Sequence, residues 1–130
     1  MFLLDTDSII YSLKGEPQVV GNLRRHRSDP LYISSITLME LYYGACKSRQ
    51  LDANIAKIKS IEATFVILAP GPETGEIFGR LNAGLESNGS RLADLDLIIA
   101  AIALTRNLTL VTNYQRHFAR IPALRLANWT

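Results

Sequence analysis

The chain opens with Phe2-Leu3-Leu4-Asp5-Thr6-Asp7, a short apolar run that ends directly on two carboxylates. The apolar residues predict a buried strand, and residues 9–13 predict the helix that follows it. In open α/β sheets, ligands bind outside the carboxyl ends of the strands. Two acids at such an end are typical of a site for a cation or a phosphoryl group. A simpler interpretation is that Asp7 caps a helix over residues 8–14, but it leaves Asp5 unexplained.

The rest of the chain alternates apolar strand-like runs with segments of helical periodicity. Strands are expected at residues 31–33, 66–69, 108–112 and 124–127, and helices at 17–27, 35–47, 52–65, 73–87 and 94–105. Strands separated by helices favour a mostly parallel sheet with helices on both faces. We therefore expect one three-layer α/β domain over residues 1–130, with about four to five strands and the last strand at an edge.

Length and composition exclude several classes of protein. The 130 residues, of which 48% are hydrophobic and 20% charged, are typical of a soluble globular domain. No apolar run approaches the roughly 18 residues of a membrane span. The single Cys46 excludes an intramolecular disulfide and suits a reducing compartment, so we expect a cytoplasmic protein without a membrane partner. His26 and His117 lie too far apart in the sequence to build a zinc site.

The formal charge of +2 conceals an asymmetry. If Asp5, Asp7, Glu40 and Asp96 cluster in one cleft, the remaining residues carry +6, because all 14 basic residues stay outside it. An acidic cleft in a basic surface suits a polyanionic substrate whose phosphate is met by a metal ion. The alternative is a protein with ordinary, solvated surface arginines.

Glu40 is the only charged residue between Pro30 and Lys47. A helix that is apolar on most sides is largely buried. A lone carboxylate on it must be paired, protonated or bound to a cation to offset its desolvation. The alternatives left open are a metal ligand and a buried salt bridge to an arginine.

Asp94 and Asp96 stand at the beginning of the most apolar predicted helix. Asp96 shares a helix face with Ile99, Ala100 and Ala103, whereas Asp94 lies about 200° away. We expect Asp96 to point into the cleft and Asp94 to be the N-cap. Acids at positions 5, 40 and 96 would then suit Mg²⁺ or Mn²⁺, which prefer oxygen ligands and stabilise charge on a phosphodiester during in-line displacement.

Four segments together resemble the PIN-domain ribonuclease toxins of the VapC family, in the right order over nearly the whole chain. The C-terminal residues 124–129 are also similar to theirs. The segments are Leu3-Leu4-Asp5-Thr6-Asp7, Ile33-Ser34-Ser35-Ile36-Thr37-Leu38-Met39-Glu40-Leu41, Asp96-Leu97-Ile98-Ile99-Ala100-Ala101 and Leu110-Val111-Thr112-Asn113.

The resemblance implies a PIN-like fold and an Mg²⁺- or Mn²⁺-dependent endoribonuclease, the toxin of a type II toxin–antitoxin pair. Toxins of this family usually form homodimers and cleave structured RNA, often transfer RNA. A cognate VapB-type antitoxin inhibits them by covering the active site.

By motif position, the resemblance assigns the catalytic and metal-binding roles to Asp5, Glu40 and Asp96. Asp7 stands where the family more often has Asn, so we expect a polar support rather than a ligand. The expected supporting residues are Thr6, Asp7, Asp94, Thr112 and Asn113, of which Thr112 and Asn113 form a polar strand end beside the metal.

His117 stands in the loop where the family often has a further acid. Mg²⁺ strongly prefers oxygen ligands, so among a surface residue, a phosphate or proton-transfer contact and a metal ligand we expect His117 to be a surface residue or a phosphate contact. Direct metal ligation is the alternative, because imidazole is a reasonable ligand for Mn²⁺.

Basic and aromatic residues elsewhere are candidate RNA contacts. The candidates for phosphate contacts are Arg24, Arg25, Arg27, Lys47 and Arg49. Tyr42 and Tyr43 are candidates for stacking on bases. Packing in the core, or contact with an antitoxin or a dimer partner, are the alternatives for both tyrosines.

Two other classes of protein fit parts of the sequence. A phosphatase or phosphotransferase of the haloacid dehalogenase type also begins with a strand and Asp-x-Asp, and a phosphoaccepting receiver domain has a similar length. Both need a lysine near a late strand end, where this chain has Thr112 and Asn113. A non-catalytic PIN module that binds RNA or a partner is the third alternative, and it would not need the three acids.

Overall fold

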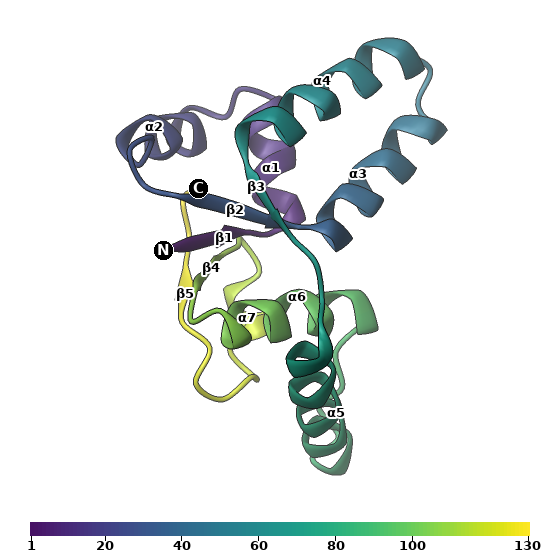
Figure 1. Ribbon diagram of the computed structural model, residues 1–130, viewed down its shortest axis with the longest axis vertical. Helices are drawn as coiled ribbons and strands as arrows, with labels where there is room; N and C mark the ends of the chain where they lie inside the picture. Colours follow the sequence, from purple (N-terminus) through teal and green to yellow (C-terminus); the bar gives the residue numbers. More distant parts are fainter.

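The computed structural model describes all 130 residues, which form one five-stranded sheet in the order β3-β2-β1-β4-β5 (Figure 1). All four strand pairings are parallel. The strands are β1 (Phe2–Leu4), β2 (Leu31–Ser34), β3 (Val66–Leu68), β4 (Thr109–Val111) and β5 (Leu126–Ala127). The helices are α1 (Thr6–Leu13), α2 (Pro17–Arg25), α3 (Ser35–Lys47), α4 (Leu51–Thr64), α5 (Pro72–Ser87), α6 (Asp94–Thr105) and α7 (Gln115–Phe118).

Two hydrophobic cores lie on opposite faces of this sheet. Leu3 and Leu110 belong to the core that also contains residues of α5 and α6, whereas Leu4 and Val111 belong to the core under α1, α3 and α4. Successive strand residues point to opposite faces. The central strands are therefore buried on both sides, as parallel strands usually are. Figure 1 shows α1 to α4 on one side of the sheet and α5 to α7 on the other.

The three-layer α/β architecture, the parallel sheet and the edge position of the last strand are confirmed. Ser34 caps α3, since its side chain accepts a hydrogen bond from the backbone N–H of Thr37 at 3.0 Å. The most apolar helix, α6, has only 12 residues. None of the helices is both long and apolar enough to cross a lipid bilayer.

Two capping assignments are wrong. The N-cap of α1 is Asp5 rather than Asp7, because the Asp5 side chain accepts the backbone N–H of Thr6 at 2.9 Å. The N-cap of α6 is Ala93, and no side chain caps this helix. Asp94 is instead the first helical residue, and its carboxylate lies 3.8 Å from the Arg91 guanidinium.

Candidate active site

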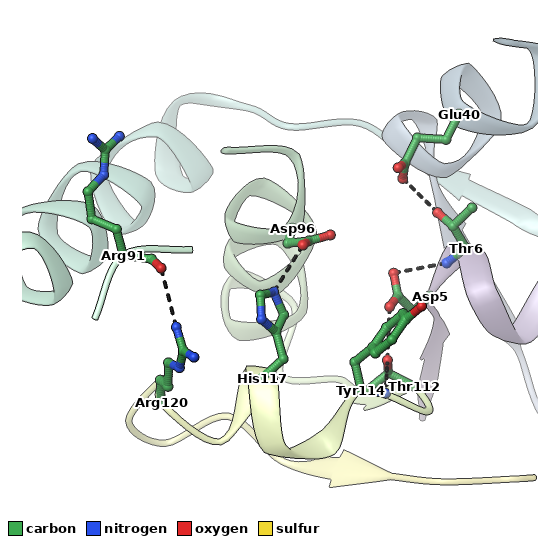
Figure 2. A network of polar contacts seen from close by, with 9 residues as sticks. All are labelled: Asp5, Thr6, Glu40, Arg91, Asp96, Thr112, Tyr114, His117 and Arg120. Carbon is green, nitrogen blue, oxygen red and sulfur yellow. Dashed lines mark hydrogen bonds and ion pairs between the residues drawn. The ribbon is translucent and has the colours of Figure 1, made fainter. Parts of the chain in front are cut away.

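The site lies at the carboxyl ends of β1 and β4, which end at the same level of the sheet. Leu4 pairs with Val111 in the parallel register, so Asp5 and Thr112 follow the two strand ends side by side. The backbone N–H of Asp5 donates to the carbonyl of Val111 at 2.9 Å. Figure 2 shows Asp5 and Thr112 between α3 on one side and α6 on the other.

Asp5 is the most buried acid of the site, with only 4% of its surface exposed. One carboxylate oxygen accepts from the Thr6 backbone N–H, and the other accepts from the Thr112 hydroxyl, each at 2.9 Å. No lysine or arginine pairs with it. Burial, followed by the negative charge of Asp7, raises the pKa of Asp5 to about 7. The site thus contains a buried carboxylate without a counter-charge.

Asp7 lies in the first turn of α1 and faces the end of β4. Its carboxylate accepts the backbone N–H of Asn113 at 2.9 Å and lies 3.4 Å from the Ser8 hydroxyl. Burial raises the pKa of Asp7 as well, partly opposed by its hydrogen bond from the Asn113 backbone. Asn113 also connects to the chain terminus, since its side-chain oxygen accepts from the Thr130 hydroxyl at 3.0 Å.

Glu40 approaches the site from α3 and is held by a hydroxyl group of α1. The Thr6 hydroxyl donates to Glu40 Oε1 at 2.7 Å and lies 3.0 Å from the hydroxyl oxygen of Thr37. Glu40 is half-buried and pairs with no arginine, so the alternative of a buried salt bridge is wrong. Thr37 is fully buried and contributes to the site, a role that the sequence did not predict although this residue precedes Glu40 on the same helix.

Asp96 approaches from α6 and is joined to His117 of α7. The His117 Nε2 lies 3.0 Å from Asp96 Oδ2, a hydrogen bond in which the imidazole donates to the carboxylate. The charge of Asp96 also contributes to the raised pKa of Asp5, and Figure 2 shows Asp96 on the side of α6 toward Asp5. Asp94 points elsewhere, toward Arg91. The pairing of His117 with Asp96 has no signal in the local sequence, because the two residues lie 21 positions apart.

The carboxylate oxygens of these acids are suitable ligands for a hard divalent cation. The acids at these strand ends and on α3 and α6 offer only oxygen atoms, which Mg²⁺ and Mn²⁺ prefer. No three acidic, histidine or cysteine residues lie close enough together to share an ion directly. Mg²⁺ usually keeps several waters and needs one or two carboxylates as direct ligands. The buried, uncompensated Asp5 is therefore the position at which a cation would stabilise the protein most.

The candidate RNA contacts lie away from this cleft. Arg24 and Arg25 end α2, and the next residue, His26, packs its ring 4.8 Å from that of Phe2 at the amino end of β1. Arg27 lies in the same turn. Lys47 and Arg49 lie at the far end of α3, about two helical turns beyond Glu40.

The two tyrosines on α3 differ in their surroundings. Tyr42 is half-buried, and its hydroxyl is hydrogen-bonded to Glu62 of α4. Tyr43 is 66% exposed, with the Lys47 ammonium 4.8 Å from its ring centroid. Tyr42 therefore joins α3 to α4, and only Tyr43 is free to meet a partner.

A cavity of about 440 Å³ adjoins the site on the side of Glu40. It lies between α1, α3 and α4 and includes Glu40 in its wall. Its lining combines apolar residues such as Ile10 and Leu13 with the two basic residues Lys14 and Lys57. The acidic cleft thus continues into an apolar cavity that contains basic groups.

Comparison with known proteins gives consistent matches along the whole chain. Residues 2–124 match the PIN domain family. Ribonuclease VapC2 of Haemophilus influenzae is 38% identical, covering 98% of this chain and 97% of its own. The tRNA(fMet)-specific endonuclease VapC of Salmonella typhimurium is 34% identical, covering 98% of this chain and 97% of its own.

Solved structures agree with these sequence matches. The structure of VapBC2 from Rickettsia felis bound to a promoter DNA fragment superposes with a TM-score of 0.94 at 34% identity, covering 99% of this chain and 98% of the other. DNA-bound VapBC from Salmonella typhimurium superposes with a TM-score of 0.93 at 35% identity, with the same coverage.

Proposed function

The chain belongs to the PIN-domain family and is a ribonuclease toxin of the VapC type, a hydrolase; we propose that it cleaves RNA with Mg²⁺ or Mn²⁺ held, directly or through bound waters, by Asp5, Glu40 and Asp96. The observation that carries this proposal is the buried Asp5 carboxylate, whose raised pKa and missing counter-charge suit a bound cation. Family membership removes the phosphatase and receiver alternatives. A bound divalent ion would polarise the phosphodiester and activate a water.

The protein's own residues would orient the groups around that ion. Thr112 and the Thr6 backbone fix the two oxygens of Asp5, and the Thr6 hydroxyl holds Glu40. His117 holds Asp96 through a hydrogen bond, and its imidazole is a side chain that can transfer protons during catalysis. Asp7 and Asn113 support the strand ends from the other side.

The RNA substrate is proposed to be structured, such as a transfer RNA. Two relatives at 34% identity carry the name tRNA(fMet)-specific endonuclease, and both match this chain over nearly its full length. A cytoplasmic location fits such a substrate. We further propose that residues 1–130 act as a single PIN domain and form a homodimer.

The solved relatives are toxin–antitoxin complexes, which implies an antitoxin partner for this chain. We propose that a VapB-type antitoxin covers the acidic cleft and fills the cavity beside Glu40. An apolar lining with Lys14 and Lys57 suits an apolar segment that carries acidic groups. An inhibitor seated there would contact Glu40 directly.

The test is cleavage of a transfer RNA pool by purified protein with Mg²⁺, with Mn²⁺, or with EDTA. Cleavage is expected with either metal ion and absent in EDTA, and Asp5→Asn should abolish it while the melting curve stays cooperative. Cleavage that persists in EDTA would overturn the metal-dependent mechanism, and loss of folding in the variant would be visible in the melt.

A further inference from the structure

The acidic cleft poses an electrostatic problem for an RNA substrate. Four acids converge on the strand ends, namely Asp5, Asp7, Glu40 and Asp96, and one divalent ion offsets only part of their charge. Affinity for a nucleic acid comes largely from lysine and arginine contacts to phosphates. Basic groups beside the cleft are therefore needed, and the arginines of α2 lie at the opposite end of β1.

Three other arginines belong to the segments around Asp96 and His117, here termed the arginine flank: Arg91 before α6, Arg116 on α7 and Arg120 after α7. Arg116 directly precedes His117 on α7. Arg120 follows α7, and its guanidinium donates to the Arg91 carbonyl at 3.3 Å. That bond joins the segment leading into α6 to the segment leaving α7. Figure 2 shows Arg91 and Arg120 on the side of His117 that faces away from Asp5.

The guanidinium groups of the flank are available to a ligand. All three residues are exposed. Arg116 and Arg120 take part in no ion pair. Arg91 forms two long ion pairs, at 4.0 Å from the Glu86 carboxylate and at 3.8 Å from the Asp94 carboxylate. Exposed ion pairs of this kind contribute little to stability, so the guanidinium can leave its carboxylate for another anion. The planar guanidinium binds phosphate through two parallel hydrogen bonds.

An exposed aromatic side chain lies beside the buried acid. Tyr114 is 59% exposed, and its ring centroid lies 6.5 Å from that of His117. Its backbone N–H donates at 3.1 Å to the Thr112 hydroxyl, the same group that holds Asp5. Figure 2 shows Tyr114 beside Asp5 and Thr112. Exposed aromatic faces stack on unpaired bases in RNA-binding proteins.

We propose that the RNA strand runs from the acidic cleft past Tyr114 and onto the arginine flank, where Arg116 and Arg120 bind its phosphates and Tyr114 stacks on a base next to the cleaved bond. The inference rests on the proposed ribonuclease function of the cleft and names the surface that holds the substrate. The flank replaces Arg24, Arg25 and Arg27 as the main basic contact.

The test compares two double variants that each lower the formal charge from +2 to 0. One is Arg116→Gln with Arg120→Gln on the flank, and the other is Arg24→Gln with Arg25→Gln on α2. Steady-state cleavage of a transfer RNA pool is measured at several salt concentrations. The flank variant should raise KM about tenfold and change kcat little. It should also lower the slope of log affinity against log salt by about 0.7 for each RNA phosphate that it no longer binds.

The α2 variant should stay close to the unmodified protein in both KM and salt slope. Equal effects of the two variants, or a larger effect on α2, would overturn the proposal. Arg116→Gln alone is the second variant, because Arg116 makes no side-chain hydrogen bond that folding could require. RNA binding in EDTA, measured by filter retention, tests the flank even if the protein shows no cleavage. Absence of cleavage by the unmodified protein would instead contradict the proposed function.

Discussion

Asp5 combines a structural and a chemical role in one side chain. It caps α1 and sits almost fully buried beside Asp7. Because its pKa in the folded protein is about 7, against 3.8 for an exposed group, the folded state binds the proton more tightly than the unfolded state. Without metal, the contribution of Asp5 to the free energy of unfolding is therefore fully present below about pH 4 and is lost as the pH rises through 7, a change on the order of 4 kcal/mol.

Removing this charge should stabilise the metal-free protein. Asp5→Asn in EDTA should raise the melting temperature at pH 8 by several degrees, and the gain should shrink toward pH 4 and vanish below it, where Asp5 is protonated in both states. Thermal melts across this pH range measure it. Glu76→Gln, at an exposed position of α5, is the control and should show no such trend. A lower melting temperature for Asp5→Asn at pH 8 would contradict the charge argument.

Substitutions of the two acids of α6 should have different effects on RNA cleavage. Asp96→Asn should lower cleavage by at least about 100-fold, since ligands and the groups that orient them typically carry effects of this size. Asp94→Asn should retain most activity, because its only partner is the exposed Arg91. Cleavage rates of the two variants decide the matter, and equal losses would show that Asp94 also faces the reaction.

His117 should act through Asp96. His117→Ala should lower cleavage in Mg²⁺ and Mn²⁺ alike, and His117→Gln should restore part of it, because an amide can also donate a hydrogen bond to the carboxylate. Titration of each metal against cleavage rate measures both effects. A loss seen only with Mn²⁺, and no rescue by Gln, would make His117 a direct ligand.

At the scale of helices and strands, the alternation of apolar runs and helical periods was enough to predict every strand and the α/β class. The residues that cap the helices were harder to predict. Asp94 has the right chemistry for a cap, but Leu92 is buried in the core, and the chain turns into the helix at Ala93. The capping position thus depends on tertiary packing, which the local sequence does not contain.

In the site, too, some contacts could be predicted from the sequence and others could not. The position of Asp5 and Thr112 follows from the sequence, because parallel strands place their carboxyl ends at one edge. The contacts of Glu40 with Thr6 and of Asp96 with His117 do not, because they depend on how whole helices pack. Arg24, Arg25 and Arg27, which the sequence offered as phosphate contacts, lie near the amino end of the first strand, because the position of α2 also depends on packing.

The Thr112 hydroxyl at the end of β4 should stabilise the charged form of Asp5. Thr112→Val keeps the shape of a fully buried residue but removes the hydroxyl that donates to Asp5, a hydrogen bond to a charged group worth about 1.5–3 kcal/mol. Cleavage and stability at pH 8 should both fall. Thr109→Val on the same strand is the matched control, since Thr109 pairs with Phe2 at the other end of the strand, away from Asp5. Equal behaviour of the two variants would remove Thr112 from the site.

At the scale of the whole molecule, three surfaces meet at the carboxyl edge of the sheet. The acidic cleft lies in the middle, the cavity beside Glu40 lies on one side, and the arginine flank lies on the other. An antitoxin on the cavity side and an RNA on the flank side would both reach the acids. Competition between them at the cleft would account for inhibition without any change of fold.

The proposed mechanism requires that one divalent ion is held jointly, directly or through its bound waters, by acids from the strand ends and from two helices. Its most direct test is calorimetric or electron paramagnetic resonance measurement of Mn²⁺ binding to the unmodified protein and to Asp5→Asn, Glu40→Gln and Asp96→Asn. Asp94→Asn serves as the control. We expect binding that each of the three variants weakens at least about tenfold and that the control leaves unchanged. Binding that survives all three substitutions, or no binding by the unmodified protein, would contradict this mechanism.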